Sequence, residues 1–384
     1  MPIDFPNTPT TGATYTSGNR TWQYDGAKWV PASTSPSGFV LEAPTDGQNY
    51  ERQNSVWVPG VGFAQGYTNK IRNGTFDVWQ RGSVTVNAAA APYTADGWLV
   101  SPSGASVTVS RMVTSTIPPP GASAMQIIGT AGVTTVTTAQ RIESYVAAFL
   151  AGQRVTFQCW AYCTIAQTPQ LAVYYTNSLD NFSAITAILS PTNLQPLVVN
   201  TWTQVAYTLD LPVAVTYNGL QVNLNFPGSL GTGSIYMAAA DLRATPGLAV
   251  GLQASPPPPE LRPVHEELLF CYRYFETGYD NGVAPGTINS AAALQFYLTN
   301  LPSATYNAAM VATFKAAKRA TPTLTLYSPI TGAAAKVRNI QGNLDLNANV
   351  SNTGTTSFSI YNVAAAAAAT TVNLGACWAA SAEL

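Results

Sequence analysis

The sequence predicts an all-β protein with small hairpin units at the N-terminus, a central β-sandwich or jelly roll, and a C-terminal β-sandwich domain. Short segments of alternating apolar and polar residues recur along the chain, and a period of two is typical of strands with one buried face. Gly and Pro, with 29 and 27 copies in 384 residues, separate these segments. Charged residues make up only 9% of the chain, which is too few for the solvated faces of long helices.

Residues 1–66 contain two similar units in tandem. The unit at 12–30 has short apolar segments on both sides of Asp25-Gly26, a strong hairpin signal. The unit at 42–58 repeats this arrangement around residues 53–55. Each unit is too small to be stable alone, so we expect this region to bind copies of itself or a partner.

Residues 69–255 form the longest segment with strand patterning, which favours a sandwich or jelly roll. One helix is predicted at 139–150, before the stop signal of Gly152. The predicted strands are 107–111, 154–162, 171–175, 201–209, 220–226 and 234–237.

Residues 256–275 are predicted to be a Pro-rich linker followed by a short helix. The prolines at 256–259 favour a stiff polyproline II spacer. Residues 263–275 have helical spacing, with one apolar stripe of Leu268, Leu269, Tyr272 and Phe275.

Residues 276–384 return to strand patterning and predict the C-terminal β domain. The alanine run at 364–369 has helical propensity, but its Thr-rich surroundings favour a loop or strand. The predicted strands are 294–298, 309–315, 323–327, 336–340 and 356–361.

Charge excludes nucleic acid as a partner, because 17 basic and 18 acidic residues give a net charge of −1 and no basic run occurs. The sequence has no stretch of about 18 uninterrupted apolar residues, so no membrane span is predicted. The N-terminus has neither a basic nor an apolar signal region, so we expect assembly in the cytoplasm.

The four cysteines, Cys159, Cys163, Cys271 and Cys377, are expected to be buried free thiols. Cys159 and Cys163 lie on one face of one predicted strand, about 13 Å apart, which is too far for a disulfide. With His265 as the only histidine, a zinc site is not expected.

Catalytic motifs are missing, so we predict that the chain is not an enzyme. A single histidine and the lack of a nucleophile elbow disfavour triad chemistry. Glycan hydrolysis needs only two carboxylates, and a depolymerase therefore stays as an alternative. The 18 acidic residues lie mostly in turns.

The strand at 154–163 predicts a sugar-binding surface. Odd positions from Val155 to Cys163 are apolar and belong in the core, whereas the opposite face carries Gln158, Trp160 and Tyr162. Aromatic rings stack on sugar rings and amides bond sugar hydroxyls. Tyr174 or Tyr175 on the next strand would join this surface. The alternative is that Trp160 and Tyr162 pack under a loop or against a neighbouring subunit.

Several ordered motifs resemble structural proteins of tailed bacteriophages. The units at 12–30 and 42–58 are similar to N-terminal segments of such proteins, and residues 73–82 with 93–98 resemble the start of fibre and spike modules related to carbohydrate-binding jelly rolls. Residues 262–275 look like the hinge motif that follows, and residues 378–384 fit the C-terminal domain.

The resemblance implies a virion protein that forms a homotrimer, contacts other virion proteins through residues 1–66 and binds host surface polysaccharide. Attachment to tail or head stays open. The preferred hypothesis is a fibre or spike subunit for adsorption to the host, and the alternative is a structural decoration or adaptor protein without a ligand.

Related modules also carry a structural calcium ion, the one cofactor that the resemblance implies. Its ligands here would be Asp77, the backbone near Asn73, and Asp241, which would join the first and last strands. Residues 238–242 depart from the pattern by keeping one acid instead of two. Asp77 and Asp241 are equally typical of turns and caps.

Overall fold

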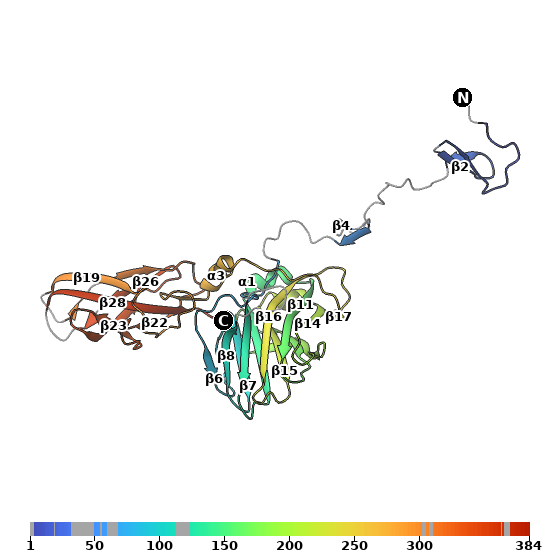
Figure 1. Cartoon of the computed structure of the whole chain (residues 1–384). Coiled ribbons are helices and arrows are strands. Elements are labelled where there is room, and N and C mark those ends of the chain that lie inside the picture. The colour runs from blue at the N-terminus through green and yellow to red at the C-terminus, as the bar shows by residue number, and fades with distance from the viewer. Residues whose placement is uncertain are drawn as a thin grey trace. The chain divides into compact units, whose positions relative to one another are not determined.

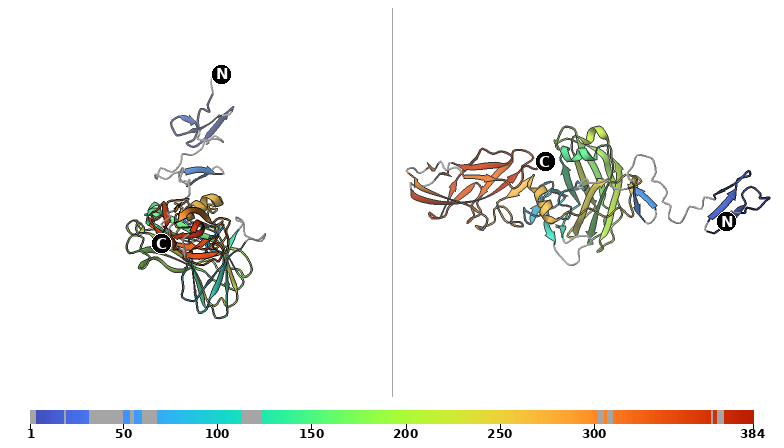
Figure 2. Two further views of the ribbon diagram at one scale, coloured as in Figure 1. Left: turned by 90° about the vertical axis from the view of Figure 1, so that its left-hand side faces the viewer. Right: turned by 90° about the horizontal axis from the view of Figure 1, so that it is seen from above.

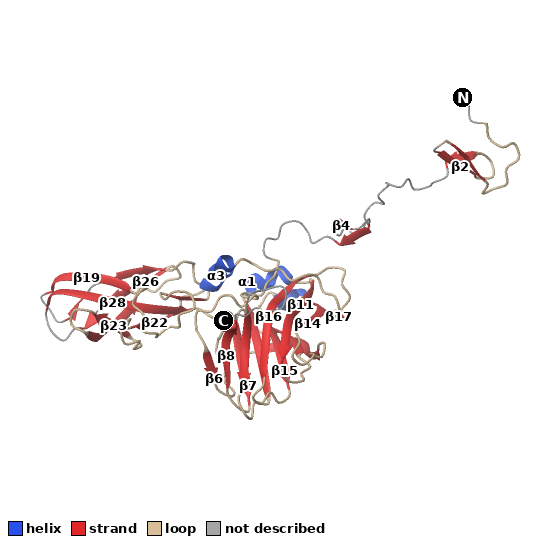
Figure 3. Cartoon of the chain, in the orientation of Figure 1, coloured by secondary structure: helices blue, strands red, loops and turns tan. Residues whose placement is uncertain are grey.

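The structure is a computed structural model that describes residues 4–18, 20–31, 50–53, 56–59, 68–112, 123–301, 305–306, 310–361, 363–364 and 369–384. It divides into one unit at 1–64 and a second at 65–384. Strands dominate both, as Figure 3 shows, and the predicted all-β class is confirmed. Among the described residues no helix is long and apolar enough to cross a membrane.

The first unit contains both predicted hairpin regions. β1 (Thr14–Ser17), β2 (Arg20–Tyr24) and β3 (Trp29–Pro31) form one antiparallel sheet, and β4 (Tyr50–Gln53) pairs with β5 (Val56–Pro59). The Asp25 carboxylate accepts hydrogen bonds from the backbone N–H groups of Ala27 and Lys28, both at 2.8 Å, which closes the turn.

Aromatic side chains form the core of the three-stranded sheet. The Phe5 ring centroid lies 5.3–5.4 Å from those of Tyr15, Trp22 and Trp29. All four side chains are only half-buried. The cluster therefore leaves apolar surface that a partner would cover.

Two antiparallel sheets form the central sandwich (Figure 1). The seven-stranded sheet has the order β17 (Gly251–Leu252), β14 (Thr203–Asp210), β11 (Arg154–Cys163), β16 (Ser234–Ala244), β9 (Ala124–Gly129), β8 (Val107–Met112) and β6 (Val84–Val86). The five-stranded sheet has the order β13 (Ile185–Asn193), β12 (Gln170–Thr176), β15 (Leu220–Pro227), β10 (Thr135–Ile142) and β7 (Trp98–Ser103). Their inner faces share one core that includes Trp98, Phe157 and Phe226.

The helix predicted at 139–150 is wrong over its first part. Residues 139–142 belong to β10, which pairs with β15 on one side and β7 on the other. Only α1 (Ser144–Ala147) and the 3-10 helix η1 (Ala148–Leu150) remain helical. β15 pairs with all of 139–142 and β7 pairs with 139–140, so tertiary pairing overrides local helical spacing.

The Pro-rich segment lies against the sandwich. The Pro257 carbonyl accepts a 2.7 Å hydrogen bond from Gln158, and the Pro258 carbonyl accepts one from Arg243. Prolines offer carbonyl acceptors but no N–H donors, so these bonds fasten the segment to the outer face of the seven-stranded sheet.

Helix α3 (Val264–Tyr272) confirms the predicted short helix, but its buried side differs from the predicted stripe. Leu269 is 54% exposed, whereas Glu267, Cys271 and Tyr272 are buried. The helix turns Glu267 inward because that carboxylate forms an ion pair with Arg262. Phe275 lies beyond the helix, at the start of β18 (Phe275–Thr277).

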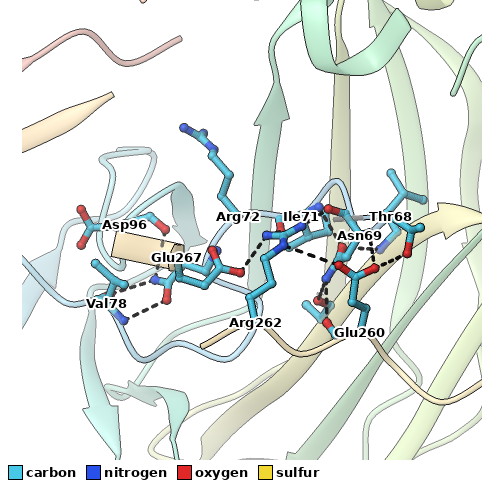
Figure 4. Close-up of polar contacts among 12 residues, drawn as sticks. Thr68, Asn69, Ile71, Arg72, Val78, Asp96, Glu260, Arg262 and Glu267 are labelled. Atoms are coloured by element: carbon cyan, nitrogen blue, oxygen red, sulfur yellow. Dashed lines mark hydrogen bonds and ion pairs between the residues drawn. The ribbon is translucent and has the colours of Figure 1, made fainter. Parts of the chain in front are cut away.

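Arg262 and Glu267 form the joint between the sandwich and α3 (Figure 4). Arg262 Nη1 donates to Glu267 Oε1 at 2.8 Å and to the Ile71 carbonyl at 3.1 Å, and Nη2 donates to the Asn69 carbonyl. Glu267 Oε2 accepts from the Asn73 N–H at 2.7 Å. Both side chains are buried and tie α3 to the first segment of the sandwich.

Cationic groups stack on aromatic rings beside this joint. The Arg72 guanidinium lies 3.4 Å from the Tyr274 ring centroid, and that of Arg81 lies 3.6 Å from the Phe275 centroid. Arg81 also contacts Asp96 and Glu383 at 3.4 and 2.8 Å. The region predicted to be a hinge is thus densely bonded.

The C-terminal domain, coloured orange to red in Figure 2, is built around the long strand β28 (Ala369–Ser381). It pairs with β18, β19 (Leu294–Leu301), β22 (Thr323–Tyr327) and β23 (Lys336–Asn339), and β23 pairs with β24 (Leu344–Asn347). A second sheet contains β21 (Met310–Thr313), β26 (Ser357–Tyr361) and β25 (Asn349–Ser351), and β20 (Thr305–Tyr306) pairs with β27 (Val363–Ala364). Residues 365–368 of the alanine run lie outside the described residues.

One ion pair lies entirely inside this domain. Lys318 Nζ donates to Glu276 Oε2 at 2.5 Å, and both side chains are 0% exposed. Lys318 also donates to the Tyr272 carbonyl, while Glu276 accepts from the Lys315 N–H at 2.9 Å. These bonds link α3, β18 and the loop before β22.

All four cysteines are free and buried, as expected. Burial raises the pKa of both Cys159 and Cys163 to about 12. The thiols are therefore neutral at ordinary pH and act as small apolar core groups.

Candidate functional site

Strand β11 alternates as the sequence predicts. Val155, Phe157 and Cys159 face the core, and Trp160 and Tyr162 face outward from the seven-stranded sheet. Both aromatic side chains are half-buried. Their rings are therefore partly available on this outer face.

Gln158 is not available to a ligand, which corrects its predicted role. Its Nε2 donates to the Pro257 carbonyl at 2.7 Å and to Asp241 Oδ2 at 3.2 Å, while its Oε1 accepts from Gln204 at 2.9 Å. The side chain is buried under the Pro-rich segment, a contact between residues about 100 apart that strand alternation cannot reveal.

Three aromatic side chains, Tyr162, Trp202 and Tyr236, form what we call the aromatic row. The Tyr162 ring centroid lies 5.5 Å from that of Trp202 and 5.2 Å from that of Tyr236. The Tyr162 hydroxyl donates to Asn200 at 3.3 Å, and Gln126 donates to the Tyr236 hydroxyl at 3.0 Å. Half-buried rings beside amides suit stacking against a sugar.

The sequence placed Trp202 and Tyr236 in predicted strands but did not assign them to this surface. Tyr236 reaches it because β16 pairs with β11 with Tyr236 opposite Tyr162. Trp160 lies one step along β11, opposite Ala238, and its indole N–H is buried with no hydrogen-bond partner among the described residues.

Tyr174 and Tyr175 do not join this surface, and the prediction that they would is wrong. Both lie on β12, which belongs to the five-stranded sheet. Tyr175 packs against the core, and Tyr174 lies on the opposite, outward side of the strand. Strands β11 and β12 are consecutive in sequence, but the chain crosses between the sheets after Cys163.

The outer face of the five-stranded sheet carries neutral polar side chains from three adjacent strands. We call this set the polar floor, and its members are Thr137 on β10, Gln170 on β12, and Gln221, Asn223 and Asn225 on β15. Pairing places Gln170 opposite Asn225, and Asn225 opposite Thr137. The alternate residues of β15, Leu220, Val222, Leu224 and Phe226, face the core.

Hydrogen bonds hold the polar floor in place. Thr137 donates to Asn225 Oδ1 at 2.9 Å, and Gln221 donates to Asn223 Oδ1 at 3.0 Å. Each amide has two donor hydrogens and one doubly accepting oxygen, so the half-buried Asn223 and Asn225 keep capacity for a ligand, whereas Gln221 is buried. Asn223 lies between Ala172 and Ala139 on the neighbouring strands, whose small side chains leave room above it.

Tyr174 and Arg141 adjoin the polar floor at one end. The pairing of β12 with β15 places Tyr174 opposite Gln221, and Arg141 Nε donates to Gln221 Oε1 at 3.1 Å. This face thus combines amides, a hydroxyl and one half-buried aromatic ring. Such a mixture is typical of surfaces that bind polyhydroxyl ligands.

The carboxylates predicted to bind calcium have separate partners. Asp77 Oδ1 accepts from Ser123 at 2.7 Å and lies 3.2 Å from Arg111 Nη2. Asp241 Oδ2 lies 3.2 Å from Arg243 Nε. A guanidinium beside each carboxylate supplies the positive charge that calcium would bring and would repel the ion. This donor set does not fit Ca²⁺.

No group of three or more His, Cys, Asp or Glu residues that could hold a metal ion occurs in the described part of the chain. Because an arginine lies beside each of the two carboxylates, we expect EDTA to leave the melting temperature of the purified protein unchanged, measured by differential scanning calorimetry against a sample in CaCl₂. A lower melting temperature in EDTA that CaCl₂ restores would contradict this expectation and support the calcium site implied by the resemblance.

Asp241 makes stability depend on pH. Burial raises the pKa of its carboxyl to about 6, although the nearby Arg243 lowers it. The folded chain thus keeps the proton to higher pH than the unfolded chain, whose Asp pKa is about 3.9. The stability contributed by this group is complete below about pH 4 and is lost as the pH rises through about 6.

As the pH rises from about 4 to about 6, the difference in free energy of unfolding between the wild type and Asp241→Asn should decrease. The decrease is at most about 1.4 kcal/mol per pH unit. Urea denaturation at a series of pH values measures this difference. Asp280→Asn, at an exposed position, is the matched control. A wild-type-minus-variant difference that stays constant from pH 4 to pH 7 would refute the assignment.

Neither the polar floor nor the aromatic row includes a carboxylate. Acidic side chains such as Asp96 and Glu267 are instead buried against arginines near the joint. A glycosidase mechanism with two carboxylates therefore has no acid–base pair in either set.

No family model and no curated protein matches the sequence. Solved structures that are similar include the tailspike protein 4 enzymatically active domain of bacteriophage CBA120, at 13% identity and a TM-score of 0.30, over 47% of this chain and 22% of that one. A putative sugar-binding protein from Bacteroides thetaiotaomicron is 16% identical, with a TM-score of 0.32, over 46% of this chain and 100% of that one. The CBM22-2 xylan-binding domain of Paenibacillus barcinonensis Xyn10C is 14% identical, with a TM-score of 0.30, over 42% and 99%. The function proposed below rests on the residues of the two faces.

Proposed function

We propose that this chain is a fibre or spike subunit of a tailed bacteriophage and that its sandwich binds a host surface glycan. The observation that carries the proposal is the polar floor, where amides from β12 and β15 and the Thr137 hydroxyl lie in register on one outer face. Sugar hydroxyls both donate and accept hydrogen bonds, and amides do the same. The adjoining Tyr174 supplies a ring for stacking.

The aromatic row gives the chain a second surface for the same glycan class. Tyr162 and Trp160, which the sequence assigned to sugar binding, lie on this face with Trp202 and Tyr236. The two surfaces lie on opposite outer faces of one sandwich, so a single chain offers both. The glycan-binding role needs no catalytic group, and we propose a binding protein and not an enzyme.

Residues 1–66 are proposed to attach the chain to other virion proteins. The support is the tandem motif and the half-buried aromatic cluster around Phe5, which leaves apolar surface for a partner. Homotrimerisation and a place in the virion, on tail or head, belong to the same proposal.

A glycan array probed with purified protein, followed by calorimetry on the glycans that bind, tests the proposal. We expect the Asn223→Ala/Asn225→Ala double variant to lose about tenfold or more in affinity, since each lost hydrogen bond is worth about 1 kcal/mol. Ser103→Ala, an exposed position on β7 beyond the floor, is the control. Tyr162→Ala and Trp202→Ala measure the contribution of the aromatic row. Lack of binding to any host polysaccharide or host cell would count against the function.

A purely structural role is the second candidate, and exposed apolar side chains of the C-terminal domain favour it. Ile288, Tyr297 and Val311 are 66%, 66% and 63% exposed, and such residues are typical of subunit contacts. Light scattering of the purified chain tests for an oligomer. An oligomer that binds no glycan would support the structural role. Glycan binding by the monomer or by the oligomer would count against a purely structural role.

A further inference from the structure

A cavity of about 330 Å³ lies at one end of the sandwich, and we call it the rim cavity. Its lining comes from residues 166–168, in the loop between β11 and β12, from Asn193, Pro196 and Leu197 at and after the end of β13, and from Pro227 at the end of β15. Three segments distant in sequence therefore meet there. Binding pockets for small ligands begin at about this volume.

Backbone hydrogen bonds hold two walls of the rim cavity together. The Leu194 N–H donates to the Pro169 carbonyl at 2.8 Å, and the Leu197 N–H donates to the Gln167 carbonyl at 2.9 Å. Pro196 further restricts the same wall, because its ring fixes one backbone angle. A preformed cavity lowers the entropy cost of binding.

The chemistry of the lining matches a neutral sugar. Ala166, Pro196, Leu197 and Pro227 offer apolar surface, and Gln167, Thr168 and Asn193 offer amides and a hydroxyl. None of these residues is charged, which favours a neutral ligand over an acidic one.

Gln167 adds an acceptor that the chain does not satisfy. Its side chain is 5% exposed, and its Oε1 has no hydrogen-bond donor among the described residues. A buried acceptor without a donor is costly. A hydroxyl brought by a ligand would supply the donor after a small side-chain adjustment.

The rim cavity adjoins the polar floor. Asn193, which lines the cavity, accepts a 2.9 Å hydrogen bond from Gln170 of the floor. Pro227 lies on the same strand as Asn225, two residues further along. A glycan on the floor would therefore end next to the cavity.

We propose that the rim cavity is a subsite for one neutral sugar unit, either the end or a branch of the glycan that lies on the polar floor. This inference rests on the proposed function, because it extends the same binding face. It makes the protein selective for glycans that carry such a neutral end or branch.

Filling the cavity tests the proposal. Ala166 is exposed at the cavity edge, so Ala166→Trp should block the cavity without disturbing the core. We expect at least tenfold weaker binding, by calorimetry, to the array glycan that the wild type binds best. For the same oligosaccharide lacking its terminal or branching neutral unit, Ala166→Trp and the wild type should have equal affinity. Leu179→Trp, at a site 67% exposed and outside the cavity lining, is the matched control.

A second measurement keeps this inference separate from the proposed function. Saturation-transfer NMR with D-glucose, D-galactose, D-mannose and N-acetyl-D-glucosamine should give a signal with the wild type that Ala166→Trp removes. If the wild type binds array glycans but Ala166→Trp changes neither measurement, the subsite is refuted and the proposed function stands. If the wild type binds neither array glycans nor these monosaccharides, both are refuted.

Discussion

Replacing Lys318 with Met is expected to lower the free energy of unfolding of the C-terminal domain by about 3–5 kcal/mol. Lys318 and Glu276 are both 0% exposed and lie 2.5 Å apart. Removing the ammonium leaves the Glu276 carboxylate buried, with the Lys315 N–H as its one remaining side-chain-directed donor among the described residues. An uncompensated buried charge costs more than the ion pair itself contributes.

Urea denaturation of the whole chain, combined with hydrogen exchange of the β28 amides, measures this loss in the domain concerned. Lys336→Met is the matched control, because Lys336 bonds the exposed Asn347 on a neighbouring strand. The double variant Lys318→Met/Glu276→Gln removes both charges and should recover much of the stability. Lys318→Met would contradict this account if it cost no more than Lys336→Met.

Arg262→Met is expected to cost a similar amount, about 3–5 kcal/mol, at the joint between the sandwich and α3. The Arg262 and Glu267 side chains are 5% and 2% exposed and lie 2.8 Å apart. Arg262 also donates to the Ile71 and Asn69 carbonyls (Figure 4). The variant therefore leaves the Glu267 carboxylate without its ion-pair partner and two backbone carbonyls, of Ile71 and Asn69, without this donor.

Hydrogen exchange at α3 and at residues 69–73, with thermal unfolding of the whole chain, measures the effect. Arg262→Lys keeps the charge but loses the fork of donors, so its effect should be intermediate. Arg154→Met is the control, because the Arg154–Asp210 pair is 38% and 61% exposed and exposed pairs contribute little. Equal losses from Arg262→Met and Arg154→Met would show that the joint does not depend on this ion pair.

Local patterning predicted most strands, but it could not assign them to sheets. The alternation of 154–163 predicts the correct faces for Phe157 and Tyr162, because every second residue from Val155 to Cys163 lies in the core. The position of Tyr174 depends on where the chain crosses from one sheet to the other, which no local pattern contains. The same limit explains the wrong helix at 139–142, whose partners β7 and β15 lie far away in sequence.

Part of the polar floor has a signal in the sequence. Residues 220–226 alternate Leu, Val, Leu and Phe with Gln221, Asn223 and Asn225, so three amides on one face were foreseeable. Their contact with Gln170 and Thr137 was not, because it depends on the register of three strands. The burial of Gln158 was equally hidden, since a segment about 100 residues away covers it.

The buried ion pair of the joint could not be predicted from the sequence, for a different reason. Arg262 and Glu267 lie in the segment 262–275 that resembles a hinge motif, but their spacing alone does not show that both become buried. Burial depends on residues 69–73, which accept from Arg262 and donate to Glu267. Sequence spacing therefore indicated a connection between domains without revealing how firmly it is held.

A crystal structure of the chain with an oligosaccharide from the glycan array tests the central claim most directly. The account predicts sugar density on the outer face of the five-stranded sheet, with hydroxyls hydrogen-bonded to Asn223 and Asn225. Density confined to the aromatic row would transfer the binding site to the other face. Density away from both faces, or none at a saturating oligosaccharide concentration, would contradict the proposal that this sandwich is a glycan-binding module.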